Sequence, residues 1–181
     1  GADNHDFPPM MAAALAAIDE IRHEVASLAG DEDGSEILEA LMRIAVPYSE
    51  LAGRALLVGT LGYCVHLATH RFGSHVLQTL LQLVATSESA DDIALHQEAP
   101  PLSAGKDLPE LSALLYAVHE ELLPHLPEMQ VHMCGSHVLR SLVCVFAGVQ
   151  MKERHGHVLR RGKQKKSKKK RALHSSDGDG R

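Results

Sequence analysis

Apolar residues recur every three or four positions along most of the chain, which is the spacing of helices rather than of strands. A first helix is expected from about residue 10 to 27. Its apolar side would carry Leu15, Ile18, Ile21, Val25 and Leu28. Nowhere do Val and Ile alternate with polar residues, as a surface strand would require. The pattern therefore predicts an all-α chain.

Further helices follow from the same pattern and from the residues that interrupt it. Gly30 to Gly34 is expected to end the first helix, and Pro47 to separate the second helix from the third, whose N-cap would be Ser49. The further helices are expected at about residues 35–45, 50–68, 71–85, 110–123 and 135–147. Residues 86 to 109 contain few large apolar side chains, which predicts an insertion loop.

One eight-residue segment occurs three times in the chain. It reads Gly-Ser-Glu-Ile-Leu-Glu-Ala-Leu from Gly34, Gly-Ser-His-Val-Leu-Gln-Thr-Leu from Gly73 and Gly-Ser-His-Val-Leu-Arg-Ser-Leu from Gly135. The copies are 39 and 62 residues apart, and the second interval includes the expected insertion. The underlying period of about 38 residues, built from helices, is typical of stacked solenoid units.

Each copy places polar residues at matching positions, and these are the candidate ligand-binding residues. They are Ser35, Glu36 and Glu39 in the first copy, Ser74, His75 and Gln78 in the second, and Ser136, His137 and Arg140 in the third. In one isolated copy, a helix N-cap would be the better explanation of the serine. Three copies in register instead favour an array that reads an extended polymer one unit at a time.

These segments resemble the second helix of a Pumilio (PUF) RNA-binding repeat, which has three base-contacting positions around two apolar residues. Longer strings are similar to the N-terminal repeats of the nucleolar protein 9 family. These strings are Leu61–Tyr63, His70–Leu81, Glu120–Leu126 and Ser136–Leu142. The resemblance covers roughly residues 10–171. It implies a right-handed α-solenoid of three-helix repeats with RNA on its concave side, of which about three repeats are present here as part of a longer curved array.

The resemblance and the composition divide the chain into six segments. They are a disordered lead-in (1–9), a divergent first repeat (10–46), a second PUF-like repeat (47–86), an insertion loop (87–109), a third PUF-like repeat (110–150) and a basic disordered tail (151–181).

By resemblance to the PUF pattern, the first and third polar positions of a repeat bond a base edge, and the middle position stacks between bases. Gln78 offers donors and an acceptor, Arg140 only donors and Glu39 only acceptors, so the three repeats should prefer different bases. The resemblance implies guanine for the first repeat, adenine for the second and cytosine for the third. His75 and His137 can stack, whereas Glu36 cannot, so the first repeat has a second interpretation as a cap that contacts no base.

The net charge of −5 combines an acidic body with a basic C-terminal run. Residues 1–159 contain eight Lys or Arg against 21 Asp or Glu, whereas nine of the 18 basic residues lie in residues 160–171. Because the body has a net charge of −13, Arg71, Arg140, Arg154 and the basic run are expected to neutralise most of the bound phosphates. The run could also be a nuclear or nucleolar localisation signal. Its residues are Lys163, Lys165, Lys166, Lys168, Lys169, Lys170 and Arg171.

No catalytic centre, cofactor or metal ion is expected. His23-Glu24 and His119-Glu120 begin like H-E-x-x-H, but the second histidine is missing from both, and the chain has no P-loop or G-x-S-x-G. Two sets of possible zinc ligands, around Cys64 and around Cys134, lack four ligands at familiar finger spacing. The odd number of three cysteines favours a reducing compartment, and the apolar stretch near the N-terminus is too short to span a bilayer.

The expected function is RNA binding in the nucleus and nucleolus, without catalysis. The resemblance implies pre-ribosomal RNA and pre-ribosomal particle proteins as partners, in maturation of 18S ribosomal RNA and the small subunit. Neither a membrane nor a small-molecule substrate is expected. The alternative is a protein-binding α-solenoid of the HEAT or armadillo kind, because such scaffolds use the same stacked helices and suit an acidic face.

Overall fold

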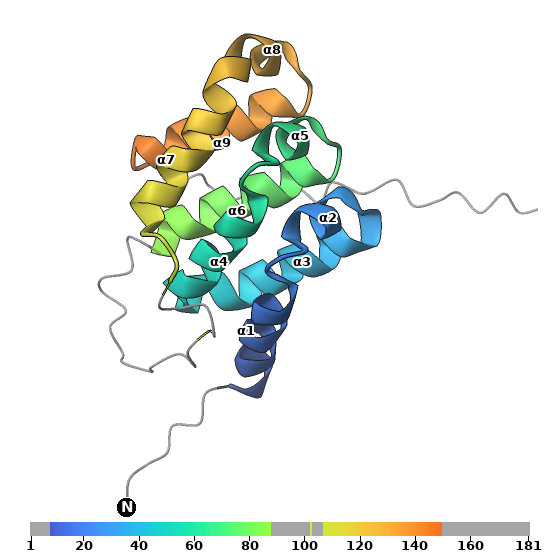
Figure 1. Cartoon of the computed structure of the whole chain (residues 1–181), viewed down its shortest axis with the longest axis vertical. Helices are drawn as coiled ribbons and strands as arrows, with labels where there is room; N and C mark the ends of the chain where they lie inside the picture. Colours follow the sequence, from blue (N-terminus) through green and yellow to red (C-terminus); the bar gives the residue numbers. More distant parts are fainter. Residues whose placement is uncertain (1–7, 88–101, 103–106, 150–181) are drawn as a thin grey trace, which may run out of the picture. The chain divides into compact units, whose positions relative to one another are not determined.

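The computed structural model describes residues 8–87, 102 and 107–149, whose path is shown in Figure 1. Most of the expected lead-in and insertion loop, and all of the expected basic tail, lie outside these described residues. The described part of the chain contains helices and turns but no strand, as the hydrophobic pattern predicts. None of its helices combines the length and the apolar character that crossing a membrane requires.

The described helices form three successive units of three. The first unit comprises α1 (Pro9–Ile21), α2 (Val25–Gly30) and α3 (Glu32–Ala45). The second comprises α4 (Glu50–Thr60), α5 (Cys64–Thr69) and α6 (Gly73–Ser87), and the third α7 (Leu111–Leu122), α8 (Leu126–Val131) and α9 (Gly135–Phe146). Short 3-10 helices, η1 (Val46–Tyr48) and η3 (Leu123–His125), follow α3 and α7. The three units agree with the α-solenoid expected from the repeated segment.

Two helices that the sequence predicted as continuous are each divided in the structure. The helix expected over residues 10–27 is α1 and α2, and the helix expected over 50–68 is α4 and α5. The second division falls at Gly62, whose φ of 83° favours a residue without a Cβ atom. Because apolar residues keep their helical spacing across both turns, the hydrophobic pattern alone could not show these divisions.

The break between α2 and α3 is also shorter than expected. Both Gly30 and Gly34 are helical, and only Asp31 lies between the two helices. A Cβ atom on Gly34 would lie 2.7 Å from the carbonyl oxygen of Leu28, so this glycine allows the close approach of α2 and α3.

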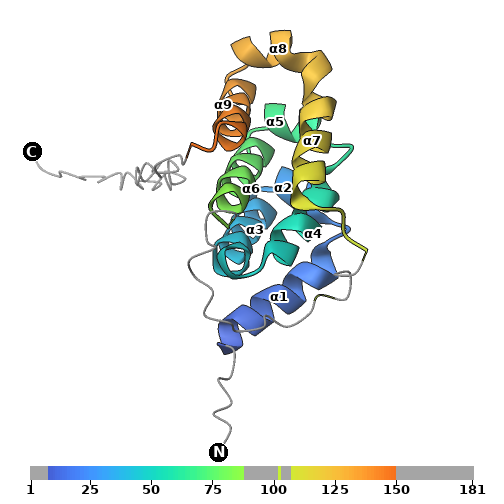
Figure 2. The same ribbon diagram turned by 90° about the vertical axis from the view of Figure 1, so that its left-hand side faces the viewer.

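The helices are arranged in layers. Figure 2 shows α3, α6 and α9 side by side in one layer, with α1, α4 and α7 opposite them. Val76, Leu77 and Leu80 of α6 are fully buried. The polar positions of the three segments are therefore carried by three neighbouring helices in the same register.

Each helix of this layer begins at a turn with the same geometry. The residues Asp31, His70 and His132, at the start of α3, α6 and α9 respectively, all have extended backbones. The Asp31 carboxylate accepts a hydrogen bond from the Gly34 N–H at 2.8 Å. The Nδ1 atoms of His70 and His132 accept from the N–H groups of Gly73 and Gly135, at 3.4 and 3.1 Å. The predicted N-cap at Ser49 is confirmed, since its Oγ accepts from the N–H of Ala52 at 3.3 Å.

Candidate RNA-binding face

A row of polar side chains runs across α3, α6 and α9. We call it the polar row, and its members are Glu36, Glu39, His75, Gln78, His137 and Arg140. All six are at least partly exposed. Figure 2 shows these three helices side by side. Because the six residues occupy equivalent positions of the repeated segment, the repeat places them on the same side of the layer. Three repeats therefore present accessible polar groups of different hydrogen-bonding character along a single line.

The serines that begin the repeated segments lie one helical turn before Glu39, Gln78 and Arg140, but the serines of the first two repeats are buried. Ser35 and Ser74 have exposed fractions of 0% and 1%. The Ser35 hydroxyl donates to the Glu32 carbonyl at 2.9 Å and the Ser74 hydroxyl to the Arg71 carbonyl at 3.4 Å. Ser136 of the third repeat is partly exposed. In the first two repeats these hydroxyls bond to the helix backbone, and RNA contact by the three serines stays a prediction.

Gln78 is half-buried in the middle of the polar row. Its Nε2 atom donates a hydrogen bond to the carbonyl oxygen of Ser74 at 2.9 Å. Because this bond uses the amide nitrogen, the amide oxygen can accept from a donor on a ligand. An amino group on a nucleobase edge is a donor of this kind.

Two of the predicted RNA-binding residues are arginines without a carboxylate partner among the described residues. Arg140 is exposed, and the Arg71 guanidinium lies 5.1 Å from the centre of the Phe72 ring. By contrast, Arg22 pairs with Asp19 at 3.2 Å and Arg43 with Glu39 at 3.8 Å. The positive charges of Arg71 and Arg140 are therefore available to a phosphate or a base.

The polar-row residues of the first repeat already have partners within the protein. The Glu39 carboxylate accepts a hydrogen bond from the Thr79 hydroxyl of α6 at 3.3 Å and lies 3.8 Å from the Arg43 guanidinium. Glu36 remains exposed and adds a second negative charge at this end of the row. These contacts favour the interpretation of the first repeat as a cap.

A contact that the sequence pattern does not reveal fixes the start of α7. The guanidinium of Arg54, with only 12% of its side chain exposed, donates to the carbonyl oxygens of Leu108 and Pro109, the latter at 2.7 Å. It also lies 3.3 Å from the Glu50 carboxylate. A single arginine in an apolar helix gave no sequence signal for a contact with a segment more than 50 residues later.

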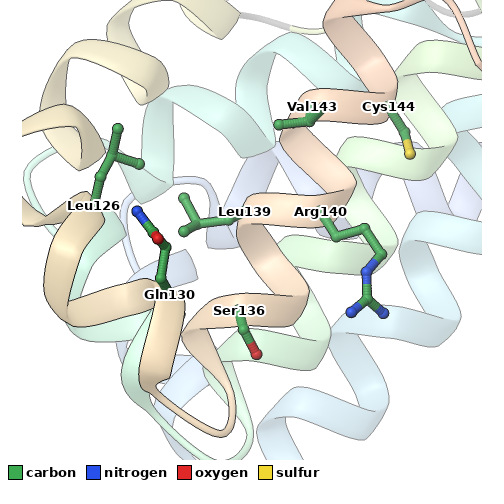
Figure 3. A pocket seen from close by; sticks show the side chains of 7 residues that line it. All are labelled: Leu126, Gln130, Ser136, Leu139, Arg140, Val143 and Cys144. Carbon is green, nitrogen blue, oxygen red and sulfur yellow. The ribbon is translucent and has the colours of Figure 1, made fainter.

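A hollow of about 440 Å³ lies between α8 and α9 of the third repeat, and the sequence gave no sign of it. It contains Ser136 and Arg140 together with apolar residues of α8 and α9. Figure 3 shows Gln130 of α8 and Leu139 of α9 pointing toward one another across it. Two candidate RNA-binding residues therefore border a largely apolar surface.

The two candidate zinc sets do not form a metal centre in the described part of the chain. No three His, Cys, Asp or Glu side chains there are close enough together to hold a metal ion. His66 and His70 instead stack with their ring centres 5.7 Å apart. Burial raises the pKa of the Cys64 thiol to about 12, which makes it a poor nucleophile and metal ligand.

Arg154 and the basic run at residues 163–171 lie outside the described residues, so phosphate binding by both and localisation by the run stay predictions. The remaining candidate residues are described, and the structure brings His75, Gln78, His137 and Arg140 together on one side of two neighbouring helices.

The chain consists of stacked three-helix units, and the polar residues at equivalent positions differ from one unit to the next. These features define a helical-repeat protein of the Pumilio class. The NOP9-like PUF repeat domain matches residues 22–179. The chain belongs to this family.

Three relatives illustrate the similarity. Nucleolar protein 9 of Candida albicans (strain WO-1) is 30% identical over 145 residues, which are 75% of this chain and 20% of the relative. Nucleolar protein 9 of Scheffersomyces stipitis is 28% identical over 141 residues, 75% of this chain and 19% of the relative. That of Meyerozyma guilliermondii is 34% identical over 93 residues, 48% of this chain and 12% of the relative. The chain thus spans about a fifth of the length of the first two relatives. No solved structure matches it significantly.

Proposed function

We propose that this chain binds single-stranded RNA along the polar row, with the second and third repeats making the base contacts. The observation that carries the proposal is the arrangement of His75, Gln78, His137 and Arg140 in equivalent, accessible places on two adjacent helices. Imidazole rings suit base stacking, and the amide and guanidinium suit the edges of different bases. Membership of a PUF repeat family supports the same function.

At a finer level, the proposed ligand is pre-ribosomal RNA and the proposed setting is the nucleolus. The name of the relatives, Nucleolar protein 9, supports the location. Under this proposal the chain assists 18S ribosomal RNA maturation beside proteins of the pre-ribosomal particle, without catalysing a reaction. The repeats are proposed to be residues 10–46, 47–86 and 110–150, with the run at 163–171 holding phosphates or directing localisation.

Binding of a fluorescent single-stranded RNA library tests the proposal. Gln78→Ala and Arg140→Ala should each weaken binding of the preferred RNA by about 1–3 kcal/mol, and should relax base preference at one position. Matched controls are Gln130→Ala, an exposed glutamine outside the polar row, and Arg22→Ala, an arginine already paired with Asp19. Both controls should leave affinity and base preference nearly unchanged.

The rival function, a protein-binding scaffold, gives a different result in the same assay. A scaffold would show no affinity for single-stranded RNA that depends on Gln78 or Arg140. Equal losses from the polar-row variants and from their controls, for every RNA tested, would likewise contradict base reading by the polar row.

A further inference from the structure

Four planar side chains lie next to one another where α5 leads into α6. The rings of His66 and His70 are stacked with their centres 5.7 Å apart, and the centres of the His70 and Phe72 rings are 5.8 Å apart. The Arg71 guanidinium continues the series, 5.1 Å from the centre of the Phe72 ring. We call these four residues the planar cluster. His66 and Arg71 are exposed, whereas His70 and Phe72 are half-buried.

The backbone of the turn holds the planar cluster in place. Nδ1 of His70 accepts hydrogen bonds from the N–H groups of Phe72 and Gly73, at 3.3 and 3.4 Å, which fixes the orientation of the imidazole ring. The carbonyl oxygen of Phe72 accepts a hydrogen bond from the N–H of His75 at 3.0 Å. Because His75 belongs to the polar row, the planar cluster lies one helical turn before that row.

The fold of the turn does not require this set of side chains. Figure 1 shows the turns that precede α3, α6 and α9 along the same side of the stack, and their extended residues and hydrogen bonds are alike. The residues equivalent to the planar cluster are Ser27, Asp31, Glu32 and Asp33 in the first repeat, and Glu128, His132, Met133 and Cys134 in the third. Because two turns of the same geometry form without stacked rings and an arginine, the planar cluster indicates a ligand.

The second repeat is also the least acidic of the three. Residues 47–86 contain two arginines and a single acidic residue, Glu50, whose carboxylate lies 3.3 Å from the Arg54 guanidinium. By contrast, residues 10–46 contain eight acidic residues against two arginines, and residues 110–150 contain four against one. A polyanion is therefore repelled least at the second repeat, where Arg71 has no carboxylate partner among the described residues.

We propose that the planar cluster binds one further nucleotide of the RNA strand on the polar row, which rests on the proposed RNA binding. The base stacks on the ring of His66, and the guanidinium of Arg71 binds the phosphate. Every base has a π face, so this site accepts all four bases, unlike the sites at Gln78 and Arg140. The second repeat then holds the strand through a contact that needs a base but does not read it.

A scan of the single-stranded RNA that the unmodified chain selects from a library tests the proposal. Each nucleotide in turn is replaced by the other three bases and by an abasic nucleotide, and affinity is measured by fluorescence anisotropy. One position should bind all four bases within about twofold, yet lose affinity about fivefold or more when it is abasic. His66→Ala should weaken the intact RNA by the same factor and abolish the abasic loss at this position alone. His66→Phe should retain both, because a flat ring remains.

Substitution of Arg71 tests the phosphate contact. Arg71→Ala should reduce the slope of log affinity against log salt by about 1, whereas Arg71→Lys should keep the slope, because the charge remains. Matched controls are His23→Ala, an exposed histidine of the first repeat, and Arg22→Ala, an arginine paired with Asp19. Both controls should leave the scan and the slope unaltered. Circular dichroism confirms that each variant is folded.

The outcomes separate this site from the polar row. Loss of binding in Gln78→Ala and Arg140→Ala, with none in His66→Ala and Arg71→Ala, would overturn the nucleotide site and leave RNA binding by the polar row intact. It would assign the planar cluster to a partner other than RNA. An abasic loss that persists in His66→Ala would also overturn the stacking contact. A chain without affinity for single-stranded RNA would overturn both the nucleotide site and the proposed function.

Discussion

Two kinds of side chain accept hydrogen bonds from the backbone at the starts of α3, α6 and α9. The carboxylate of Asp31 and the Nδ1 atoms of His70 and His132 each accept a hydrogen bond from the N–H three residues later. The first N–H groups of a helix have no partner within the helix, so an acceptor at this place stabilises its start. The histidines can act this way only when Nδ1 carries no proton.

Two replacements of His70 distinguish the role of its hydrogen-bond acceptor from that of its ring. His70→Ala should lower the free energy of unfolding by about 1 kcal/mol. His70→Asp should cause a much smaller loss, because Asp31 is the acceptor at the equivalent position of α3. Urea denaturation followed by circular dichroism measures both. His75→Ala, at an exposed position with no such bond, is the control. A loss in His70→Asp as large as in His70→Ala would contradict the capping role.

The Cys64 thiol should make stability depend on alkaline pH. Burial, with a smaller effect from the nearby Glu121 carboxylate, raises its pKa from 9.0 to about 12, so the folded chain holds the neutral thiol. Its contribution is fully present below pH 9.0, where the unfolded chain is also neutral, and is lost as the pH rises toward 12. Cys64→Ala should therefore show a smaller loss of stability over this range in urea titrations. Identical pH slopes for the two proteins would contradict this assignment.

At the level of elements, the turn between α4 and α5 is held by a residue of the next repeat. Glu121 of α7 binds the N–H groups of Gly62 and Cys64, on either side of the positive-φ turn that divides the expected single helix. This contact joins the second repeat to the third. It also satisfies backbone donors at the start of α5 that would otherwise need water.

Loss of the Glu121 carboxylate should therefore weaken the interface between the second and third repeats. Glu121→Ala should lower the free energy of unfolding by about 1–3 kcal/mol, because two N–H groups lose a charged acceptor. Glu120→Ala, at the exposed neighbouring position, should change it by less than about 0.5 kcal/mol. Chemical denaturation monitored by circular dichroism compares the two variants. Equal effects would show that the contact across the repeats contributes little.

The sequence predicted some helices correctly and missed the divisions of two others, for physical reasons. Apolar periodicity and the repeated segment correctly placed the helices that became α3, α6 and α9, because their buried positions recur in register. The same periodicity joined α1 to α2 and α4 to α5, because turns of three residues do not interrupt the apolar spacing. At the turn between α4 and α5, the positive φ of Gly62 and the contact of Glu121 with its N–H explain why the chain turns.

For the candidate site, the repeat register correctly identified which residues share a helix face but not how deep each one lies. His75, Gln78, His137 and Arg140 are accessible, whereas Ser35 and Ser74 are buried and bond to their own helices. A helix begins with unpaired backbone groups, and a serine there can bond to the backbone as readily as to a ligand. Sequence spacing cannot distinguish these two outcomes.

Over the whole molecule, the polar row changes character from one end to the other. Glu36 and Glu39 make the row acidic at the first repeat, Gln78 is neutral at the second, and Arg140 places a positive charge in the row at the third. With a net charge of −13 in residues 1–159, the body offers little general attraction for RNA. We therefore expect the affinity for RNA to come from two sources, which are base contacts in the second and third repeats and phosphate contacts from the basic run.

Removal of residues 160–171 tests this division. The shortened chain should bind all RNA sequences more weakly by a similar factor, and its affinity should fall less steeply with salt, because fewer counterions are released on binding. Gln78→Ala should instead change base preference and leave the salt slope nearly unaltered. Filter binding at several salt concentrations measures both. A deletion that altered base preference would contradict the separation of roles.

Photocrosslinking of the chain to single-stranded RNA, with the crosslinked residues mapped by mass spectrometry, tests the central claim most directly. Binding along the polar row should give crosslinks on α6 and α9, at or beside His75 and His137, and these should decrease in Gln78→Ala and Arg140→Ala. Crosslinks confined to the layer of α1, α4 and α7, or to residues 160–171, would contradict the account.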